Sequence, residues 1–165
     1  MIVNQYTVLR VAHINLPPVD GLLRRFDLKL MLVARDEDIP SSYWGDDEAG
    51  VSADMVFIRP DTPVHSMLHE AAHAICCAPE RRKVLDTDAG GDDLEESAVC
   101  YLQVELAACL PEVGRARMLH DMDCWGYSFR LGSALRWLAV DADDAQAWLL
   151  TRGLLNVDGR LRIPA

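Results

Sequence analysis

The chain has 165 residues, of which half are hydrophobic, and its formal net charge is −10. This length and composition predict one domain with a substantial core. The negative charge argues against a surface for nucleic acid or anionic membranes, because such surfaces are basic. The short basic run at residues 81–83 is expected to be a solvated turn.

The five cysteines include no Cys-x-x-Cys pair. An odd number without that spacing predicts neither a disulfide framework nor a zinc knuckle, and reduced thiols are typical of the cytoplasm. Residues 1–20 lack the basic start and continuous apolar run of a signal peptide. Since no apolar stretch approaches about eighteen residues, no membrane span is expected either. We therefore expect a cytoplasmic protein.

The first 60 residues predict a small, mostly antiparallel sheet. Residues 3–14 alternate loosely between apolar and polar side chains, which indicates a strand. The apolar run at residues 28–34 predicts a central strand, and residues 51–59 predict a further strand that ends before a proline. A free edge on this last strand would bind an extended peptide by strand addition.

An acidic loop is expected at residues 35–50, between the second and third predicted strands. It contains Tyr43 and Trp44. Aromatic side chains beside a cleft can contact a substrate. Packing of both rings against the protein is the simpler interpretation and is the one expected here.

The most informative motif of the chain is the pentapeptide HEAAH at residues 69–73, which reads H-E-x-x-H. A Thr-Pro pair before it and an Ala-Pro pair after it delimit a helix over residues 62–78. That helix places His69 and His73 one turn apart on one face, where both imidazoles can bind one Zn²⁺. Glu70 is then the base that takes a proton from water. The alternative is two ordinary helix histidines beside a solvated glutamate.

The third metal ligand must come from another element. His65 lies about 12 Å from His73 along the helix axis, too far to share an ion, and is expected at the rim of a cleft or exposed. Residues 92–110 predict a second helix, in which Glu95 begins an otherwise apolar face. A buried carboxylate is costly unless it is paired or binds metal, so Glu95 is the expected ligand and Glu96 the reserve. Alternatively, both are first-turn acids that complement the helix dipole.

The C-terminal third predicts helices and one stretch dense in polar and aromatic residues. Hydrolysis at a zinc site needs a donor directed at the oxyanion, and His120, Tyr127 and Arg130 are candidates. Ordinary packing is the alternative for each of them. Asp121 or Asp123 is a candidate for orienting a ligand imidazole, although aspartates are also common in turns.

The spacing of these motifs resembles a known enzyme clan. H-E-x-x-H followed by E-x-x-A on a second helix, here Glu95 to Ala98, is similar to the gluzincin metallopeptidases of the thermolysin type, and most to small cytoplasmic proteins of the ImmA/IrrE kind. Parts of the chain also resemble an uncharacterised bacterial family. The clan resemblance covers residues 28 to about 110. It implies Zn²⁺ held by His69, His73 and Glu95, with residues 51–58 as the edge strand beside the metal helix.

We therefore expect one α+β domain over residues 1–165, with the sheet in 1–60, the metal-site helices in 62–110 and further helices in 111–153. The expected activity is zinc-dependent hydrolysis of a protein or peptide substrate, with Glu70 as general base and His120 or Tyr127 as oxyanion donor. The alternative is a non-catalytic metal-binding regulatory or protein-interaction module. A covered strand edge, or a fourth protein ligand such as Cys77, would favour that module. The sequence does not indicate the oligomeric state.

Overall fold

The computed structural model describes residues 8–165. Residues 3–7 of the strand expected at residues 3–14 therefore lie outside the described residues. The remaining residues do not form a strand, because Val11–His13 forms a short 3-10 helix, η2, and Arg10 makes one isolated bridge with Pro63. This bridge holds the segment beside the start of the helix that carries the H-E-x-x-H motif.

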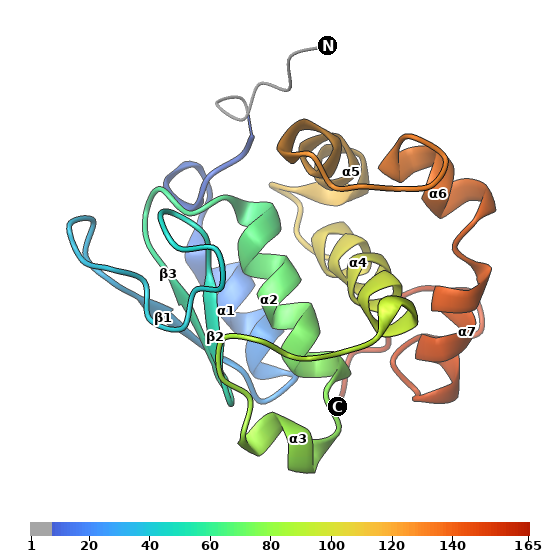
Figure 1. Ribbon diagram of the computed structural model, residues 1–165, viewed down its shortest axis with the longest axis horizontal. Helices are drawn as coiled ribbons and strands as arrows, with labels where there is room; N and C mark the ends of the chain where they lie inside the picture. Colours follow the sequence, from blue (N-terminus) through green and yellow to red (C-terminus); the bar gives the residue numbers. More distant parts are fainter. Residues whose placement is uncertain (1–7) are drawn as a thin grey trace.

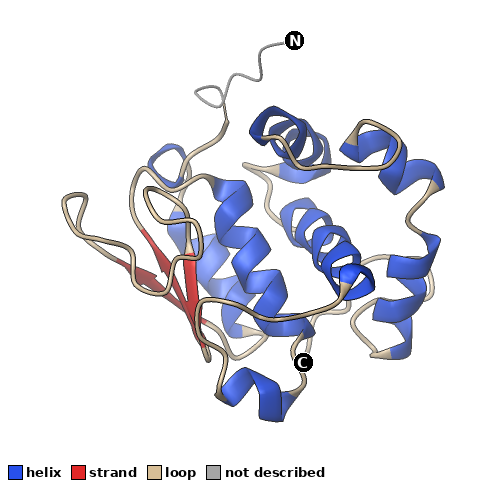
Figure 2. Ribbon diagram, in the orientation of Figure 1, coloured by secondary structure: helices blue, strands red, loops and turns tan. Residues whose placement is uncertain are grey.

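The sheet has three strands, β1 (Lys29–Leu32), β2 (Gly50–Ser52) and β3 (Met55–Ile58), in the order β1-β3-β2 (Figure 2). The expected strand at residues 51–59 is a hairpin whose turn includes Ala53, with a positive φ of 51°. β3 is the central strand, and it pairs with β2 in antiparallel and with β1 in parallel orientation. The prediction of a central strand at residues 28–34 is therefore wrong, since that run forms the edge strand β1. The sheet is mixed rather than mostly antiparallel, because the long acidic segment between β1 and β2 allows the chain to return in the same direction.

The described residues contain seven α-helices, and they cover the sheet on one side (Figures 1 and 2). They are α1 (Leu16–Arg24), α2 (Val64–Cys76), α3 (Pro79–Lys83), α4 (Asp93–Ala108), α5 (Gly114–Trp125), α6 (Ala134–Val140) and α7 (Asp143–Thr151). The fold is therefore α+β, as predicted. No helix within residues 8–165 has the length and apolar character needed to cross a bilayer.

Helix α2 lies between the sheet on one side and α4 on the other (Figure 1). The apolar stripe predicted for it is buried, with Leu68, Ala71 and Ala72 inaccessible to solvent. Helix α4 begins where the Asp92 side chain accepts a hydrogen bond of 2.8 Å from the backbone N–H of Glu95. Because α5 and α7 also pack on α4, the C-terminal helices share one core with α2 and α4.

The acidic loop packs closely against β2 at Gly50, where there is no room for a side chain. A Cβ atom there would lie 1.8 Å from the Pro40 carbonyl oxygen, and Gly50 also forms a bridge with Ser42. The backbone N–H of Ala49 donates to Ser66 Oγ of α2 at 2.9 Å. The end of the loop is thereby fixed to both the sheet and α2.

Gly50→Ala should lower the free energy of unfolding by about 1–3 kcal/mol, because the loop backbone must move to make room for the methyl group. Gly21→Ala is the matched control. Gly21 lies inside α1, and a Cβ atom added there would have nothing within 4 Å, so that substitution should raise the free energy of unfolding by roughly 0.5–1 kcal/mol. Urea denaturation of both variants measures the difference, and equal effects would contradict the described packing at Gly50.

Candidate metal centre

Helix α2 brings the two motif histidines together on one face, as the i, i+4 spacing predicts. The Nε2 atoms of His69 and His73 lie 3.1 Å apart, and their rings meet edge to face at 89°. Both side chains are largely buried. Two imidazole nitrogens that face one point are the first requirement of a metal site.

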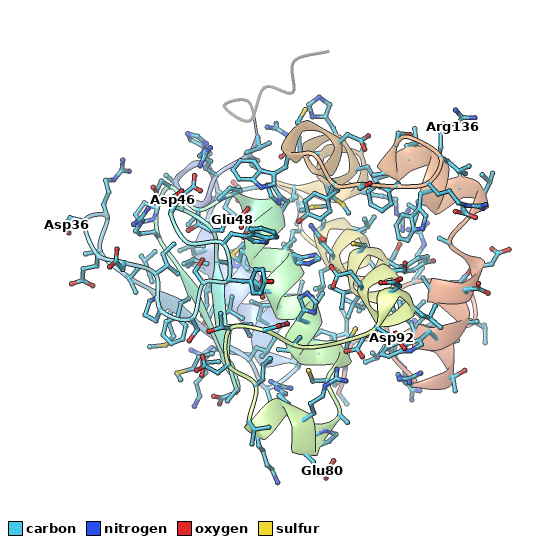
Figure 3. The ribbon with its side chains drawn as sticks, in the orientation of Figure 1. Asp36, Asp46, Glu48, Glu80, Asp92 and Arg136 are labelled. Carbon is cyan, nitrogen blue, oxygen red and sulfur yellow. The ribbon has the colours of Figure 1, made fainter. Side chains whose placement is uncertain are left out.

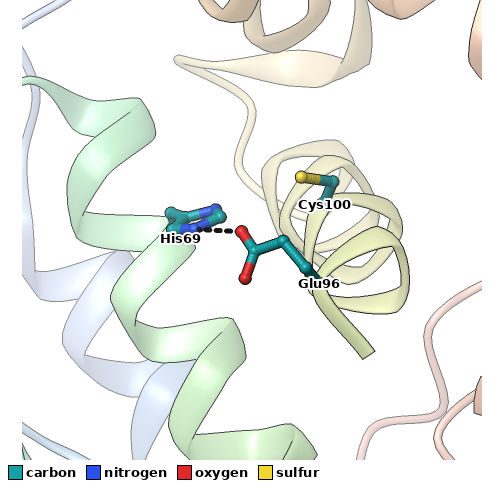
Figure 4. A group of neighbouring side chains, drawn as sticks. All are labelled: His69, Glu96 and Cys100. Carbon is teal, nitrogen blue, oxygen red and sulfur yellow. Dashed lines mark ion pairs between the residues drawn. The ribbon is translucent and has the colours of Figure 1, made fainter. Parts of the chain in front are cut away.

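The carboxylate that reaches these imidazoles belongs to Glu96, not to the expected Glu95 (Figure 4). Glu96 Oε1 lies 3.0 Å from His69 Nε2, and Oε2 lies 3.3 Å from His73 Nε2. Glu95 is buried, as its position on the apolar face predicts, but its partner is the guanidinium group of Arg81 on α3. The prediction that a buried Glu95 needs a partner is therefore correct. The partner is the side chain of an arginine and not a metal ion.

Gln103 of α4 orients the first imidazole, a role that the sequence analysis did not assign. Its Nε2 donates to the backbone oxygen of His65 at 2.9 Å, so its Oε1 faces His69 Nδ1, also at 2.9 Å. In the neutral ring, Nδ1 therefore carries the hydrogen and Nε2 presents a lone pair. A metal-binding histidine commonly has its other ring nitrogen fixed in this way.

The donor atoms of these three residues fit a small divalent cation. The lone pair of His69 Nε2 faces the Glu96 carboxylate, and two acceptors at 3.0 Å need a proton or a metal ion between them. Two ligand atoms bound tetrahedrally to zinc, at bond lengths of about 2.0–2.1 Å, are separated by roughly 3.3–3.4 Å. The two Nε2 atoms lie 3.1 Å apart, and they lie 3.0 and 3.3 Å from Glu96 Oε1 and Oε2 respectively, which is only slightly shorter.

The pKa values of the two histidines shift in opposite directions, upward for His69 and downward for His73. Burial acts to lower the pKa of His69, but its neighbours, including the Glu96 carboxylate with which it forms a hydrogen bond, raise it well above 6.5. Burial, followed by repulsion from His69, lowers the pKa of His73 to about 4. The pair therefore holds one positive charge where the Glu96 carboxylate faces both rings.

Cys100 supplies a fourth candidate ligand, which sequence reasoning also missed. Its thiol and donor atoms of His69 and Glu96 lie within 4.8 Å of one another (Figure 4). Cys100 follows Glu96 by one helical turn on α4, so the spacing E-x-x-x-C facing H-E-x-x-H was the available signal. Cys77, the fourth ligand considered from the sequence, instead accepts hydrogen bonds of 3.4 Å from Arg81.

Of the three candidate oxyanion donors, the structure brings only Tyr127 to the centre. Its ring centroid lies 5.6 Å from that of His69, and its hydroxyl lies 3.1 Å from His65 Nδ1. His65 is 1% exposed, so its expected position at a rim or in solvent is wrong; Tyr127 and Trp125 cover it. His120 lies away from the centre on α5, where its side chain is 62% exposed and faces Asp121.

The other polar candidates of the C-terminal third have structural partners instead. Arg130 pairs with an aspartate at the surface. Asp121 accepts hydrogen bonds from the Leu9 backbone and from a nearby arginine. Asp123 accepts from the backbone N–H of Ala134 at 2.8 Å. Neither aspartate orients an imidazole of the candidate site. For His69, the side chain of Gln103 does so instead.

A cavity of about 970 Å³ opens beside the imidazoles. Its lining includes the motif residues His69 and Glu70, the end of the acidic loop, and the aromatic residues Trp125 and Tyr127. Glu70 has no hydrogen-bond or ion-pair partner among residues 8–165. Burial raises the pKa of Glu70 to about 7, so its carboxyl group can exchange a proton near neutral pH.

The strand edge expected to bind a peptide is covered by the chain itself. β3 lies between β1 and β2. On the outer side of β2, Val51 donates to the Ser41 oxygen at 3.3 Å and accepts from the Thr87 N–H at 2.9 Å. Both backbone groups of Val51 are therefore already hydrogen-bonded, and a peptide cannot pair with the sheet at this residue.

Comparisons of the chain with protein-family models, curated proteins and solved structures return no match. Functional inference therefore depends on the residues of the centre and on their geometry.

Glu96→Gln should weaken zinc binding more than about 100-fold, because the loss of a ligand exceeds the 10–100-fold effect typical of an outer partner. Glu95→Gln is the matched control on the same helix turn; it removes the charge that faces Arg81 and should retain most of the affinity. Competition with a chromophoric chelator measures both affinities. A greater loss in Glu95→Gln would restore the ligand assignment made from the sequence.

Proposed function

We propose that the protein is a zinc-dependent hydrolase of peptide bonds whose metal is held by His69, His73 and Glu96. One observation carries this proposal: the two imidazole Nε2 atoms of α2 lie 3.1 Å apart, and each faces one oxygen of the Glu96 carboxylate on α4, at 3.0 and 3.3 Å. Beside them, the Glu70 carboxylate lines the cavity without a partner of its own. An open position beside the ligands and a free carboxylate are the features that distinguish a catalytic zinc site from a structural one.

When bound, zinc would supply Lewis acidity that lowers the pKa of water to about 7 and polarises a carbonyl group. Glu70 accepts the proton of the attacking water and then donates it to the leaving amine. The raised pKa of about 7 suits both steps at neutral pH. Since Glu70 follows His69 directly in the chain, the same helix fixes the base and the first ligand.

Tyr127 is the donor to the developing oxyanion in this mechanism. Burial raises the pKa of its phenol, which therefore remains protonated and able to donate. Gln103 Nε2 lies 3.4 Å from the same hydroxyl and His65 Nδ1 lies 3.1 Å from it. These two contacts position the phenol beside His69.

The arrangement of the elements supports a zincin-like fold. A helix bearing H-E-x-x-H lies between a sheet and a second helix that supplies a glutamate, as in the gluzincins that the sequence resembles. The glutamate differs by one residue from the E-x-x-A register of that resemblance, since Glu96 rather than Glu95 faces the histidines. The proposal therefore takes its ligand set from the geometry and not from the motif.

A non-catalytic metal-binding module is the second candidate, and two observations favour it. The Cys100 thiol lies within 4.8 Å of donor atoms of His69 and Glu96 and is a candidate fourth ligand, and the edge of β2 is covered at Val51. A site closed by four protein ligands is typical of structural zinc. Such a module would keep the metal and the fold but would not hydrolyse a substrate.

Glu70→Gln should reduce hydrolysis by about 10²–10⁴-fold, because the amide cannot accept the proton. Zinc content and thermal stability should remain close to those of the wild type, since Glu70 is not a ligand in this proposal. The measurement combines cleavage of a peptide library, followed by mass spectrometry, with metal analysis of the same preparations. Wild-type rates in the variant would rule out this mechanism.

Cys100→Ser separates the open site from the closed one. If the site is open, the variant should retain near-stoichiometric zinc, whereas His69→Ala should lose it. Metal content measured by mass spectrometry after purification provides the comparison. Loss of zinc in Cys100→Ser to the extent seen in His69→Ala would favour the closed, non-catalytic module.

A further inference from the structure

We infer that the cavity beside the metal centre selects a substrate with a cationic side chain, of the arginine or lysine type, and that Glu48 is its main specificity determinant. For the bond that is cleaved, this inference rests on the proposed hydrolase function. Binding of the cationic group does not depend on cleavage and can be tested separately.

The cavity joins the acidic loop to the metal centre. Residues 44–48 form one wall, and Glu70, Trp125 and Tyr127 lie on other parts of the lining. Figure 3 shows Asp46 and Glu48 on the loop beside α2, well away from Asp36 at the tip of the preceding turn. A bound substrate therefore contacts the loop and the catalytic carboxylate within one cavity.

Negative charge in this cavity exceeds the positive charge that the protein supplies. Seven carboxylates and two guanidinium groups line it. Arg10 pairs with Asp47, and Arg59 pairs with Asp61 at 2.8 Å. The carboxylates that have no ion pair with a lysine or arginine among residues 8–165 include Asp38, Asp46 and Glu48. A divalent ion held by Glu96 would leave these three without a counterion.

Glu48 is the best placed of these carboxylates to recognise a ligand. It is partly buried, and its Oε1 accepts a hydrogen bond of 2.7 Å from Trp125 Nε1, which holds the side chain in the cavity. A partly buried carboxylate without a cation is unfavourable, and burial correspondingly raises the pKa of Glu48. A ligand ammonium or guanidinium group would supply the missing charge.

The aromatic residues of the loop are an independent indication of a ligand. Tyr43 and Trp44 were expected to pack, but their exposed fractions are 54% and 75%. Trp44 lines this cavity and a smaller neighbouring one of about 250 Å³ that reaches His73. Large exposed aromatic side chains at the mouth of a cavity mark binding surfaces, and their faces attract cations.

Because the edge of β2 is covered, the protein would have to select its substrate through a substrate side chain and not through the substrate main chain. Val51 already has backbone partners in Ser41 and Thr87, so an extended substrate cannot pair there. Recognition by strand addition depends on main-chain groups and is tolerant of sequence. Without it, the charged cavity is the feature of the site that can discriminate between substrates.

The test uses Glu70→Gln protein loaded with zinc, which should bind without turnover. Acetyl-arginine amide and acetyl-citrulline amide are the probes, because they have nearly the same shape and differ in charge. Titration followed by NMR should give at least about tenfold tighter binding of the arginine probe, the scale of one charge-assisted hydrogen bond. Adding Glu48→Gln should remove this preference, while its amide oxygen can still accept the Trp125 hydrogen bond.

Asp36→Asn is the matched control, because it removes an exposed carboxylate of the same acidic segment that does not line the cavity. It should leave the preference unchanged. Equal binding of the two probes, binding of neither, or equal effects of Asp36→Asn and Glu48→Gln would overturn the inference.

Digestion of a peptide library by the wild type separates this inference from the proposed function. Cleavage concentrated beside basic residues supports both. Cleavage without a preference for basic residues keeps the hydrolase and overturns the cationic selectivity. A preference for the arginine probe without any cleavage keeps the cationic site and overturns the hydrolase.

Discussion

The contact between α2 and α4 is the constraint on which the candidate centre depends. The two histidines come from one helix and the carboxylate from the other, and donor atoms must approach to about 3 Å before one ion can join them. Small buried residues on both helices, Ala72 and Ala98 among them, permit such close packing. A helix displacement of an ångström or two would leave two neutral imidazoles and a separate carboxylate.

The C-terminal part of the chain takes part in this constraint. Gln103 contacts the backbone of His65 and the imidazole of His69, and its amide nitrogen also faces the Tyr127 hydroxyl. Two helices and the segment after α5 thus meet at one buried amide. Because this amide also fixes the His69 tautomer, the helix packing and the orientation of the candidate ligand depend on the same side chain.

Features that depend on local periodicity could be predicted from the sequence. Features that depend on contacts between residues far apart in the chain could not. The H-E-x-x-H helix, its apolar stripe and the second helix were predicted, because a period of 3.6 residues decides them. The choice between Glu95 and Glu96 depended on Arg81, which looked like part of a solvated turn. His65 looked exposed because its cover, Tyr127, lies 62 residues away.

The sheet and the loop show the same limit. No local pattern reveals that β1 pairs in parallel with β3, or that residues 41 and 87 cover Val51.

The fixed position of this loop links the charge of the chain to its proposed chemistry. A net charge of −10 argues against polyanionic partners. In the structure, part of that charge is concentrated in one cavity beside the imidazoles. Such a field attracts a divalent ion and a cationic substrate alike, and it repels anions from the site.

Because the loop is anchored at Gly50 and at Ala49, its carboxylates need not be ordered when a ligand binds. Selectivity by a pre-arranged charge costs less conformational entropy than selectivity by a mobile loop. The main-chain edge that a peptide would otherwise use is occupied by the residues that hold this loop in place. The same packing therefore removes one mode of recognition and provides the other.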